Sequence, residues 1–392
     1  MKKTKLAGSR RMAHGRLVRT FVAIVVGMAL LGIVSFGNAQ ASIPPGTNGK
    51  IVYGQVFPNY GFTINPDGSR KHRIGPAGST TCNTFSPSGD RVLCNLWSSD
   101  GVPQPATANP DGSDFTLLNP NLPLDLFCLS WSPTGNRLLC HSEGIANPAD
   151  AGLYTVRSSD AGGLVRVTAT PPASFDIGQY GYSPDGSRIL FARFTGEQGT
   201  DEQGTLFSVN PNGTGKLRLS PPGLSVIDLG FFDRVGADWS PDGSRVAFAA
   251  QKLSKGGFKT ALFVVGADGT GLRQVTPSGI GAISAQWSPN GALIAFTSCC
   301  GNVQAWVVSP GGAGLRHVTN ATQADDHGDS WAISLGAVWS PDSKKLLFNR
   351  QSKSGQTSLW TANVDGTGLS RLTDTRSLSL YAWGTAPVRS AR

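Results

Sequence analysis

The sequence predicts an all-β fold, and within that class a seven-bladed β-propeller of four-stranded antiparallel blades. Three observations support this. A ten-residue motif occurs six times, a second turn motif lies between its copies, and no helical hydrophobic period follows the N-terminal forty residues. The motif copies begin 46, 51, 57, 48 and 52 residues apart, and a period near fifty with internal turns is typical of propellers. The copies are FSPSGDRVLC, WSPTGNRLLC, YSPDGSRILF, WSPDGSRVAF, WSPNGALIAF and WSPDSKKLLF, which start at Phe85, Trp131, Tyr182, Trp239, Trp287 and Trp339.

Each copy of the motif has the features of a β-hairpin. In the copy at Trp239, an apolar strand ends at the tryptophan and residues 240–243 form the turn. Proline fixes φ at the first corner of such a turn, aspartate bonds its own backbone, and glycine adopts the positive φ that closes it. Val246 and Phe248 follow at a spacing of two, which places both on one face of the next strand.

A second turn, clearest in ADGTGLRQVT from Ala267 and VDGTGLSRLT from Val364, separates a third strand from a fourth. Seven candidate second strands occur, near residues 51, 91, 137, 188, 245, 293 and 345, whereas the six motifs supply only six first strands. The missing first strand is expected at the C-terminus, in the apolar segment around Trp383. We therefore expect residues 378–384 to pair beside 49–54 and to close a ring over residues 49–385, because closure removes an exposed sheet edge.

Residues 1–41 are predicted to be a secretory signal peptide, followed by a short linker at 42–48 and, after the propeller, a tail at 386–392. Seven basic residues precede an apolar run from about residue 21 to 36, and Ala39-Gln40-Ala41 supplies the small residues of a cleavage site. A retained membrane anchor is the alternative, although the run is shorter than the ~20 residues of a usual span. The protein is thus expected to be secreted or periplasmic, with no membrane span after signal removal.

The charge balance argues against nucleic acid as a partner. The chain has 34 Lys and Arg against 25 Asp and Glu. Seven of the basic residues lie in the leader, which contains no acid, so the mature chain carries 27 basic against 25 acidic residues, a net charge of +2. The basic character therefore belongs to the leader, and no basic cluster interleaved with aromatic residues follows it. We expect a monomer without an organic cofactor.

The repeated units resemble the Ser-Pro-Asp-Gly repeats of TolB-type propellers, which also occur in the propeller domains of prolyl-oligopeptidase-like enzymes. The resemblance covers about residues 47–385. The copies at Tyr182 and Trp239 match in full, and the other four depart at one turn position. TolB proteins resemble a six-bladed ring behind a small α/β domain, whereas this sequence shows seven units behind a leader. The oligopeptidases carry a hydrolase domain with a Gly-x-Ser-x-Gly nucleophile motif, which the sequence lacks.

The turns from first to second and from third to fourth strands are short, so they share one rim of the ring. The remaining connections are longer, among them residues 169–179, 220–236 and 320–337, and share the opposite rim, which we call the long-loop rim. Variable loops on a rigid scaffold are where binding usually occurs. The residues expected to bind there are Asp325, Asp326, His327, Asp329, Trp331, Asp233 and His141.

The acidic segment 325–329 is the sharpest local feature of this rim. Its three carboxylates and one imidazole fit a divalent cation, with Asp325, Asp326, His327 and Asp329 as ligands. A solvated acidic loop without metal is the alternative. A real site would take further oxygens from other blades, for which the candidates are Asp201, Glu202, Asp228, Asp233 and Asp238.

Four of the six cysteines lie in two successive hairpins, and each pair is symmetric about its turn. The two members of a pair should face each other across antiparallel strands, and an exported chain with an even number of cysteines favours disulfides. Buried thiols that fill strand positions are the alternative. The predicted bridges are Cys82–Cys94 and Cys128–Cys140, and the neighbours Cys299 and Cys300 are a further candidate pair.

Two functions are compatible with these features. The first is an exported, non-catalytic binding propeller whose long-loop rim receives a protein, a peptide or a cell-envelope glycan. It is supported by the complete repeat architecture and by the lack of a catalytic motif. The second is a metal-assisted lyase or hydrolase that acts on a polysaccharide or peptide at the rim of the central funnel, and it is supported by the acidic segment 325–329.

Overall fold

The computed structural model describes residues 44–55, 59–119, 124–145, 147–178, 180–196, 203–227, 236–252, 259–298, 303–319, 331–333, 336–352, 357–373 and 378–387. These residues form strands, turns and two short 3-10 helices, with no α-helix among them. No helix in the described ranges is long and apolar enough to cross a membrane. The predicted all-β class is confirmed.

The strands follow one another as antiparallel hairpins. Their bounds are β1 (Asn48–Gln55), β2 (Asn59–Ile64), β3 (His72–Gly78), β4 (Thr80–Phe85), β5 (Val92–Trp97), β6 (Pro103–Ala108), β7 (Thr116–Leu117), β8 (Leu126–Trp131), β9 (Arg137–Ser142), β10 (Gly152–Arg157), β11 (Val165–Arg166), β12 (Ser174–Ile177), β13 (Ile189–Thr195), β14 (Gln203–Val209), β15 (Leu217–Arg218), β16 (Leu224–Val226), β17 (Ala237–Trp239), β18 (Arg245–Lys252), β19 (Thr260–Gly266), β20 (Arg273–Gln274), β21 (Gln286–Trp287), β22 (Ile294–Thr297), β23 (Ala305–Val308), β24 (Arg316–His317), β25 (Trp331–Ile333), β26 (Val338–Trp339), β27 (Lys345–Ser352), β28 (Thr357–Asn363), β29 (Ser370–Arg371) and β30 (Leu378–Thr385). The 3-10 helices are η1 (Pro148–Asp150) and η2 (Ser278–Ile280).

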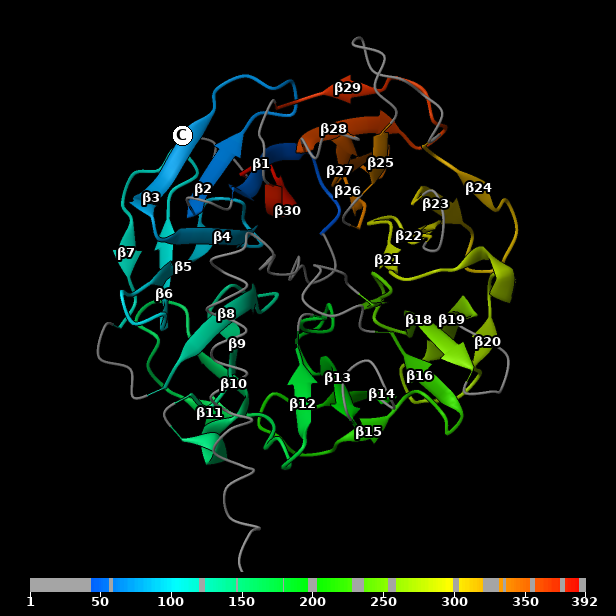
Figure 1. The fold of residues 1–392 in the computed structure, drawn as a ribbon, viewed down its shortest axis with the longest axis horizontal. Coiled ribbons are helices and arrows are strands. Elements are labelled where there is room, and N and C mark those ends of the chain that lie inside the picture. The colour runs from blue at the N-terminus through cyan, green and yellow to red at the C-terminus, as the bar shows by residue number, and fades with distance from the viewer. Residues whose placement is uncertain are drawn as a thin grey trace, which may run out of the picture. The chain divides into compact units, whose positions relative to one another are not determined.

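Hydrogen bonding joins these strands into sheets that follow one another around a central axis (Figure 1). Separate sheets are formed by β1, β2 and β3 with β30, by β4–β7, by β8–β11, by β21–β24 and by β25–β29. The strands β12–β20 form one nine-stranded sheet, because β14 and β16 pair at Gly204 and Val226. Figure 1 places β4, β8, β21 and β30 next to the axis. This arrangement of antiparallel sheets is that of a β-propeller.

The chain ends pair as the sequence predicts. β30 is antiparallel to β1, with Trp383 opposite Ile51. The indole Nε1 of Trp383 donates a hydrogen bond to the Gly49 carbonyl at 3.2 Å, and the Ala386 N–H donates to the Thr47 carbonyl at 2.8 Å. The first and last strands of the propeller therefore share one sheet, which ties the two ends of the propeller together.

The serine hydroxyl holds the recurring Ser-Pro turn. The hydroxyl of Ser240 accepts from the backbone N–H five residues later at 2.9 Å and donates to the Asp242 carboxylate at 2.6 Å. The hydroxyl of Ser86 accepts in the same way at 3.0 Å, but it donates to Asp90 at 2.8 Å. In this copy Ser88 and Asp90 have exchanged the positions of aspartate and serine within the turn. This copy therefore differs in sequence from the motif but retains its polar contacts.

These turns pack against one another at the rim that carries them, which we call the turn rim. A Cβ atom on Gly135 would lie 3.6 Å from Pro87, and Gly186 on Pro133, Gly243 on Pro184 and Gly291 on Pro241 repeat this contact at 3.5, 3.6 and 3.8 Å. The chain ends continue the series. The Gly46 N–H donates to the Pro341 carbonyl at 3.2 Å, and the Thr385 hydroxyl donates to the Pro87 carbonyl at 3.2 Å.

The aromatic residue that opens each motif is buried, as the repeat predicts. Trp339 and Trp383 belong to one core cluster with residues of β1, β27 and β28, so each packs against more than one sheet. Burial therefore supports packing between sheets as the shared role of this aromatic series. The buried side chains are Phe85, Trp131, Tyr182, Trp239, Trp287, Trp339 and Trp383.

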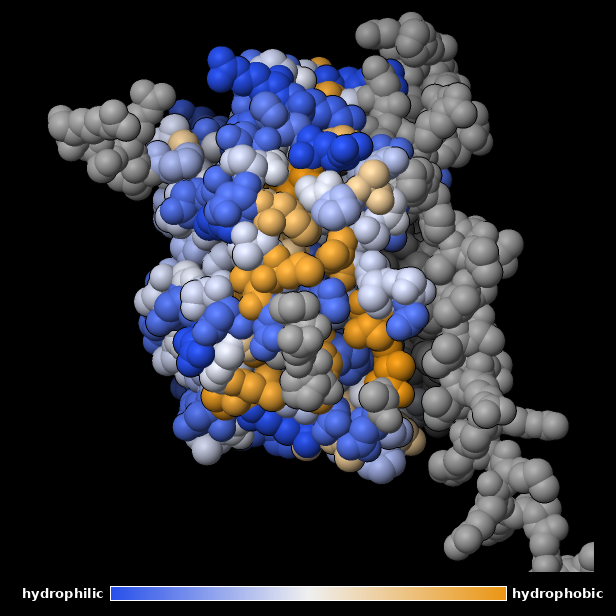
Figure 2. Space-filling model, turned by 90° about the vertical axis from the view of Figure 1, so that its left-hand side faces the viewer, coloured by the Kyte–Doolittle hydropathy of each residue, from blue (hydrophilic) through white to orange (hydrophobic). Residues whose placement is uncertain are grey.

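Hydrophobic side chains also reach the outer surface of the sheets. Figure 2 views the side that carries β3 and β7 and shows hydrophobic patches between hydrophilic side chains. The described residues of this region include Phe115 and Leu117, which are partly buried and pack against the core cluster shared by the β4–β7 sheet and the sheet of β1, β2, β3 and β30. Packing between neighbouring sheets stops at their short outermost strands. The side chains of these strands are therefore expected to be partly exposed.

Both predicted disulfides are present, Cys82–Cys94 between β4 and β5 and Cys128–Cys140 between β8 and β9. A β-bulge in each hairpin brings the cysteines opposite each other. Next to the turn, Phe85 pairs with Val92, and that register would place Cys82 opposite Asn95 without the bulge. Symmetry about the turn therefore predicts the right pairs but not the bulge. The candidate pair Cys299 and Cys300 lies outside the described residues.

Three connections that the sequence analysis treats as loops contain strands. β12, β16 and β25 lie within 169–179, 220–236 and 320–337, and they pair with the far ends of β13, β18 and β27. The other ends of β13, β18 and β27 lie next to the Ser-Pro turns. They pair with the segments that precede these turns. The first strand of these units is therefore split in two, and the long-loop rim carries regular structure.

Candidate functional site at the long-loop rim

Most residues predicted for the long-loop rim lie outside the described residues. Those outside are Asp325, Asp326, His327, Asp329, Asp233, Asp201, Glu202 and Asp228. Trp331 is part of β25, but its side chain is not among the described ones. The cation site at 325–329 therefore stays a prediction. The two remaining candidates, His141 and Asp238, have defined surroundings.

Asp238 is buried in β17 and is not placed to join a cation site at the rim. Its Oδ2 accepts a hydrogen bond from the backbone N–H of Trp287, in the next sheet, at 2.8 Å. Gln286 repeats this contact one sheet further on, since its Oε1 accepts from the Trp339 N–H at 3.0 Å. The side chain before the motif's aromatic residue thus joins neighbouring sheets at these two places. This corrects the expectation that Asp238 adds an oxygen ligand to the rim.

The Asp238→Asn variant is expected to be more stable than the wild type at neutral pH. Burial raises the pKa of Asp238 well above its usual value, and the Trp287 hydrogen bond opposes this only in part. The stability that protonated Asp238 contributes is present below its unfolded pKa of about 4 and is lost as the pH rises through the folded pKa. Asparagine keeps the acceptor and does not ionise. Urea unfolding at pH 7 should show a gain of about 1–3 kcal/mol, with little gain at pH 4.

Gln286→Glu is the matched control for this prediction, because it places an ionisable group in the equivalent contact. It should destabilise the protein at pH 7 and much less at pH 4. Equal effects of Asp238→Asn at both pH values would show that ionisation of Asp238 does not oppose folding.

His141 lies near the end of β9, between β8 and β10. Its ring is partly buried. Burial lowers the pKa of His141, while the carboxylates of Glu143, Asp125 and Asp176 act in the opposite direction. These acids come from three separate connections of the long-loop rim. Within the described ranges, no group of three or more His, Cys, Asp or Glu side chains is arranged to hold a metal ion.

Asp176 of β12 forms an ion pair with Arg193 of β13. Arg193 Nε donates to Asp176 Oδ1 at 2.6 Å, and a terminal guanidinium nitrogen donates to Oδ2 at 2.7 Å and to the Ala169 carbonyl at 3.0 Å. The carboxylate is fully buried. A bidentate pair of this kind fixes geometry strongly, and loss of one partner would leave a buried charge. The pair therefore holds β12 in place beside His141.

One carboxylate holds the start of the β9–β10 connection. Asp125, just before β8, accepts from the Ser142 hydroxyl at 2.5 Å and from the backbone N–H groups of Glu143 and Ile145 at 3.1 and 3.3 Å. The Ser142 hydroxyl in turn accepts from the Gly144 N–H at 3.1 Å. Because charge-assisted bonds to backbone donors are strong, this carboxylate orders the loop before any ligand is present.

Side chains also hold the far end of this connection, around η1. The Asn147 side chain accepts from the Ala149 N–H at 3.2 Å, and the Tyr154 hydroxyl donates to the Asp150 carbonyl at 2.8 Å. Arg166 of β11 donates to the Ala149 carbonyl at 2.7 Å. We call residues 142–145 and 147–151, together with Asp125, the braced loop.

The braced loop exposes a hydrophobic side chain. Ile145 is 51% exposed, whereas Leu164 and Leu272, the other exposed large hydrophobic residues in the described ranges, are 41% and 37% exposed and lie at turns of the opposite rim. Glu143, two residues before Ile145, is exposed as well. An apolar side chain on an ordered loop loses little conformational entropy when a partner covers it. The braced loop is therefore suited to bind a partner.

No protein-family model matches the sequence. Tol-Pal system protein TolB 1 of Novosphingobium aromaticivorans is 37% identical over 90 residues, which cover 23% of this chain and 18% of that protein. The chain thus aligns with less than a fifth of the length of this curated relative.

Solved propellers resemble the whole fold. TolB from Acinetobacter baumannii has a TM-score of 0.51 at 14% identity, over 97% of this chain and 74% of that chain. The β-propeller domain of the Trilobed protease from Pyrococcus furiosus has a TM-score of 0.58 at 13% identity, over 86% of this chain and 99% of that one. At such identities the likeness shows the fold alone. Together with the partial curated match and the closed series of antiparallel sheets, it shows that this chain has a β-propeller fold similar to that of TolB.

Proposed function

We propose that this protein is an exported, non-catalytic binding propeller whose long-loop rim binds a protein or peptide. The braced loop carries the proposal. It presents an exposed isoleucine and an exposed glutamate on a backbone that Asp125 already orders. An apolar side chain that a partner covers within a polar rim is a common contact point of protein-binding surfaces.

The relatives and the leader support the same proposal. The curated relative is named as a Tol-Pal system protein, which agrees with an envelope location for this chain. The leader at 1–41 has the order of a secretory signal, and the two disulfides suit an oxidising compartment outside the cytosol. A periplasmic or secreted binding protein accounts for all three observations.

Ile145→Asp is expected to weaken capture of the envelope partner by at least tenfold, because it places a charge where an apolar side chain would be covered. Leu164→Asp is the matched control, since Leu164 is similarly exposed but lies on the turn rim. Immobilised wild type and both variants should be compared on the same envelope extract, with each bound protein quantified by mass spectrometry. Equal loss of capture in the two variants, or none in Ile145→Asp, would show that the braced loop is not the binding face.

The metal-assisted lyase or hydrolase is the second candidate function, favoured by the acidic segment 325–329. Metal analysis of the purified mature protein separates the two functions. Stoichiometric metal that is lost when Asp325, Asp326 and His327 are changed to alanine would favour the enzyme. Specific capture that needs Ile145 and no metal would favour the binding propeller.

A further inference from the structure

A pocket of about 380 Å³ lies at the turn rim between the β4–β7 and β8–β11 sheets. Turns of both sheets line it. Seven of its twelve lining residues carry a hydroxyl group. The remaining side chains include one carboxylate, Asp90, and one guanidinium, Arg91, and the apolar part comes from Trp131 and Leu118. Its walls are therefore rich in groups that both donate and accept hydrogen bonds.

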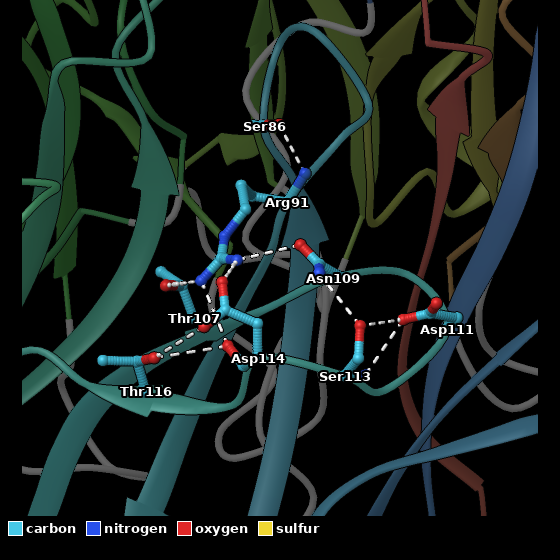
Figure 3. Close-up of polar contacts among 8 residues, drawn as sticks. All are labelled: Ser86, Arg91, Thr107, Asn109, Asp111, Ser113, Asp114 and Thr116. Carbon is cyan, nitrogen blue, oxygen red and sulfur yellow. Dashed lines mark hydrogen bonds and ion pairs between the residues drawn. The ribbon is translucent and has the colours of Figure 1, made fainter.

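Arg91 makes contacts within its own sheet, as Arg188 does at the same motif position, whereas Arg245 does not. Arg245 occupies the same motif position, and its guanidinium lies over the ring of Trp287, in the next sheet, 4.9 Å from the centroid. Arg91 instead points along its own sheet (Figure 3). Its guanidinium donates to Asn109 at 2.9 Å, to Thr107 at 2.7 Å and to Asp114. The space beside Trp131 is therefore left open.

The charges of the pocket favour a neutral ligand. Asp114 neutralises Arg91, and Asp90 adds a negative charge to the wall, so an anion would gain little there. The hydroxyls of Ser86 and Ser88 both donate to Oδ1 of Asp90, which leaves Oδ2 as an acceptor for a ligand hydroxyl. Each wall hydroxyl that donates within the protein can still accept a hydrogen bond.

We propose that this pocket binds a neutral saccharide unit. Sugar hydroxyls donate to the wall hydroxyls and to Asp90, and the C–H face of the ring packs on the apolar part formed by Trp131 and Leu118. The volume lies at the lower end of small-molecule sites, which span ~300–1,000 Å³, and suits one or two sugar rings. The pocket is on the rim opposite the braced loop, so a saccharide and a protein partner can bind together.

Titration calorimetry of the full mature protein with glucose, galactose, mannose, N-acetylglucosamine, maltose and chitobiose tests the proposal. At least one of these neutral sugars is expected to bind. Ser88→Ala removes one wall hydroxyl and should weaken that binding about fivefold, the effect of one hydrogen bond. Ser187→Ala is the matched control, because Ser187 also donates to its turn carboxylate, Asp185, but does not line the pocket.

Ser159→Trp provides a second variant that fills the pocket from its exposed edge. It should abolish sugar binding while the thermal midpoint stays at the wild-type value, which separates occlusion from misfolding. Sugar binding that survives Ser159→Trp, or that Ser88→Ala and Ser187→Ala weaken equally, would overturn the assignment to this pocket. A failure of all six sugars to bind the wild type would overturn the proposal itself.

Discussion

Trp383→Ala is expected to remove about 3–5 kcal/mol from the free energy of unfolding, the usual cost of truncating a fully buried tryptophan. The side chain is 1% exposed and packs in the cluster that contains Trp339 and Tyr381. Its indole N–H also donates to the Gly49 carbonyl, which would be left without that partner. Domains of this kind are stable by only about 5–15 kcal/mol, so this one change should remove a large part of the total. Urea unfolding followed by far-ultraviolet circular dichroism measures it.

Leu164→Ala is the control for this variant. Leu164 is 41% exposed, so its truncation should cost less than about 1 kcal/mol. A chain that ends at residue 377 lacks β30 and should fail to unfold cooperatively, because β1 would keep β2 but lose its antiparallel partner on the other side. If Trp383→Ala cost no more than Leu164→Ala, the closing strand would not contribute to the stability of the propeller.

The ring closure could be predicted because local chemistry specifies each hairpin. The serine of every Ser-Pro turn accepts from a backbone N–H five residues later, and this bond depends on residues that adjoin in the sequence. Counting hairpins then left a second strand without its first strand at the start of the repeats and a spare first strand at their end. The pairing of β1 with β30 uses both. The burial of the motif's aromatic residues was likewise predictable, because one such residue occurs in each repeat at the same position of its hairpin.

The split first strands could not be predicted, because they depend on distant partners. β18 runs for eight residues, further than its first strand, β17, can cover. The uncovered end pairs with β16, which consists of only Leu224, Ser225 and Val226. Three residues are too few to show a strand period in the sequence. The bulges beside the disulfides escaped prediction for the same reason, since they arise from pairing and carry no residue pattern of their own.

The braced loop was predicted only in part. His141 was predicted because it stands where a second strand meets a long connection, but Asp125 lies 17 to 20 residues before the groups that it binds, and no sequence pattern links them. Ile145 reads as an ordinary loop residue until the structure shows that its backbone is held and its side chain exposed. Asp238 was expected at the rim although it lies within the strand that ends at Trp239, and the structure places its side chain in a contact between sheets.

Reduction of both disulfides is expected to lower the free energy of unfolding by about 5–6 kcal/mol. Each bridge spans 12 residues, and the chain-entropy relation gives about 3 kcal/mol for a loop of that length. The variant Cys128→Ala/Cys140→Ala should lose about half of the total and should still fold, since the first bridge remains. Urea unfolding with and without a reductant measures both values. Four thiols that react in the native, unreduced protein would contradict the prediction.

The two bridges should also influence each other, because Asn95 connects their hairpins. Its side chain accepts from the Cys128 N–H at 2.8 Å and donates to the Cys128 carbonyl at 3.0 Å, while Asn95 itself follows Cys94 on β5. Contacting sites of this kind show coupling energies of about 0.5–3 kcal/mol. A double-mutant cycle on the two cysteine pairs should therefore deviate from additivity, and the deviation should shrink in an Asn95→Ala background. Strict additivity in the wild-type background would mean that each disulfide stabilises its own hairpin alone, and that the contact between the sheets does not transmit the constraint.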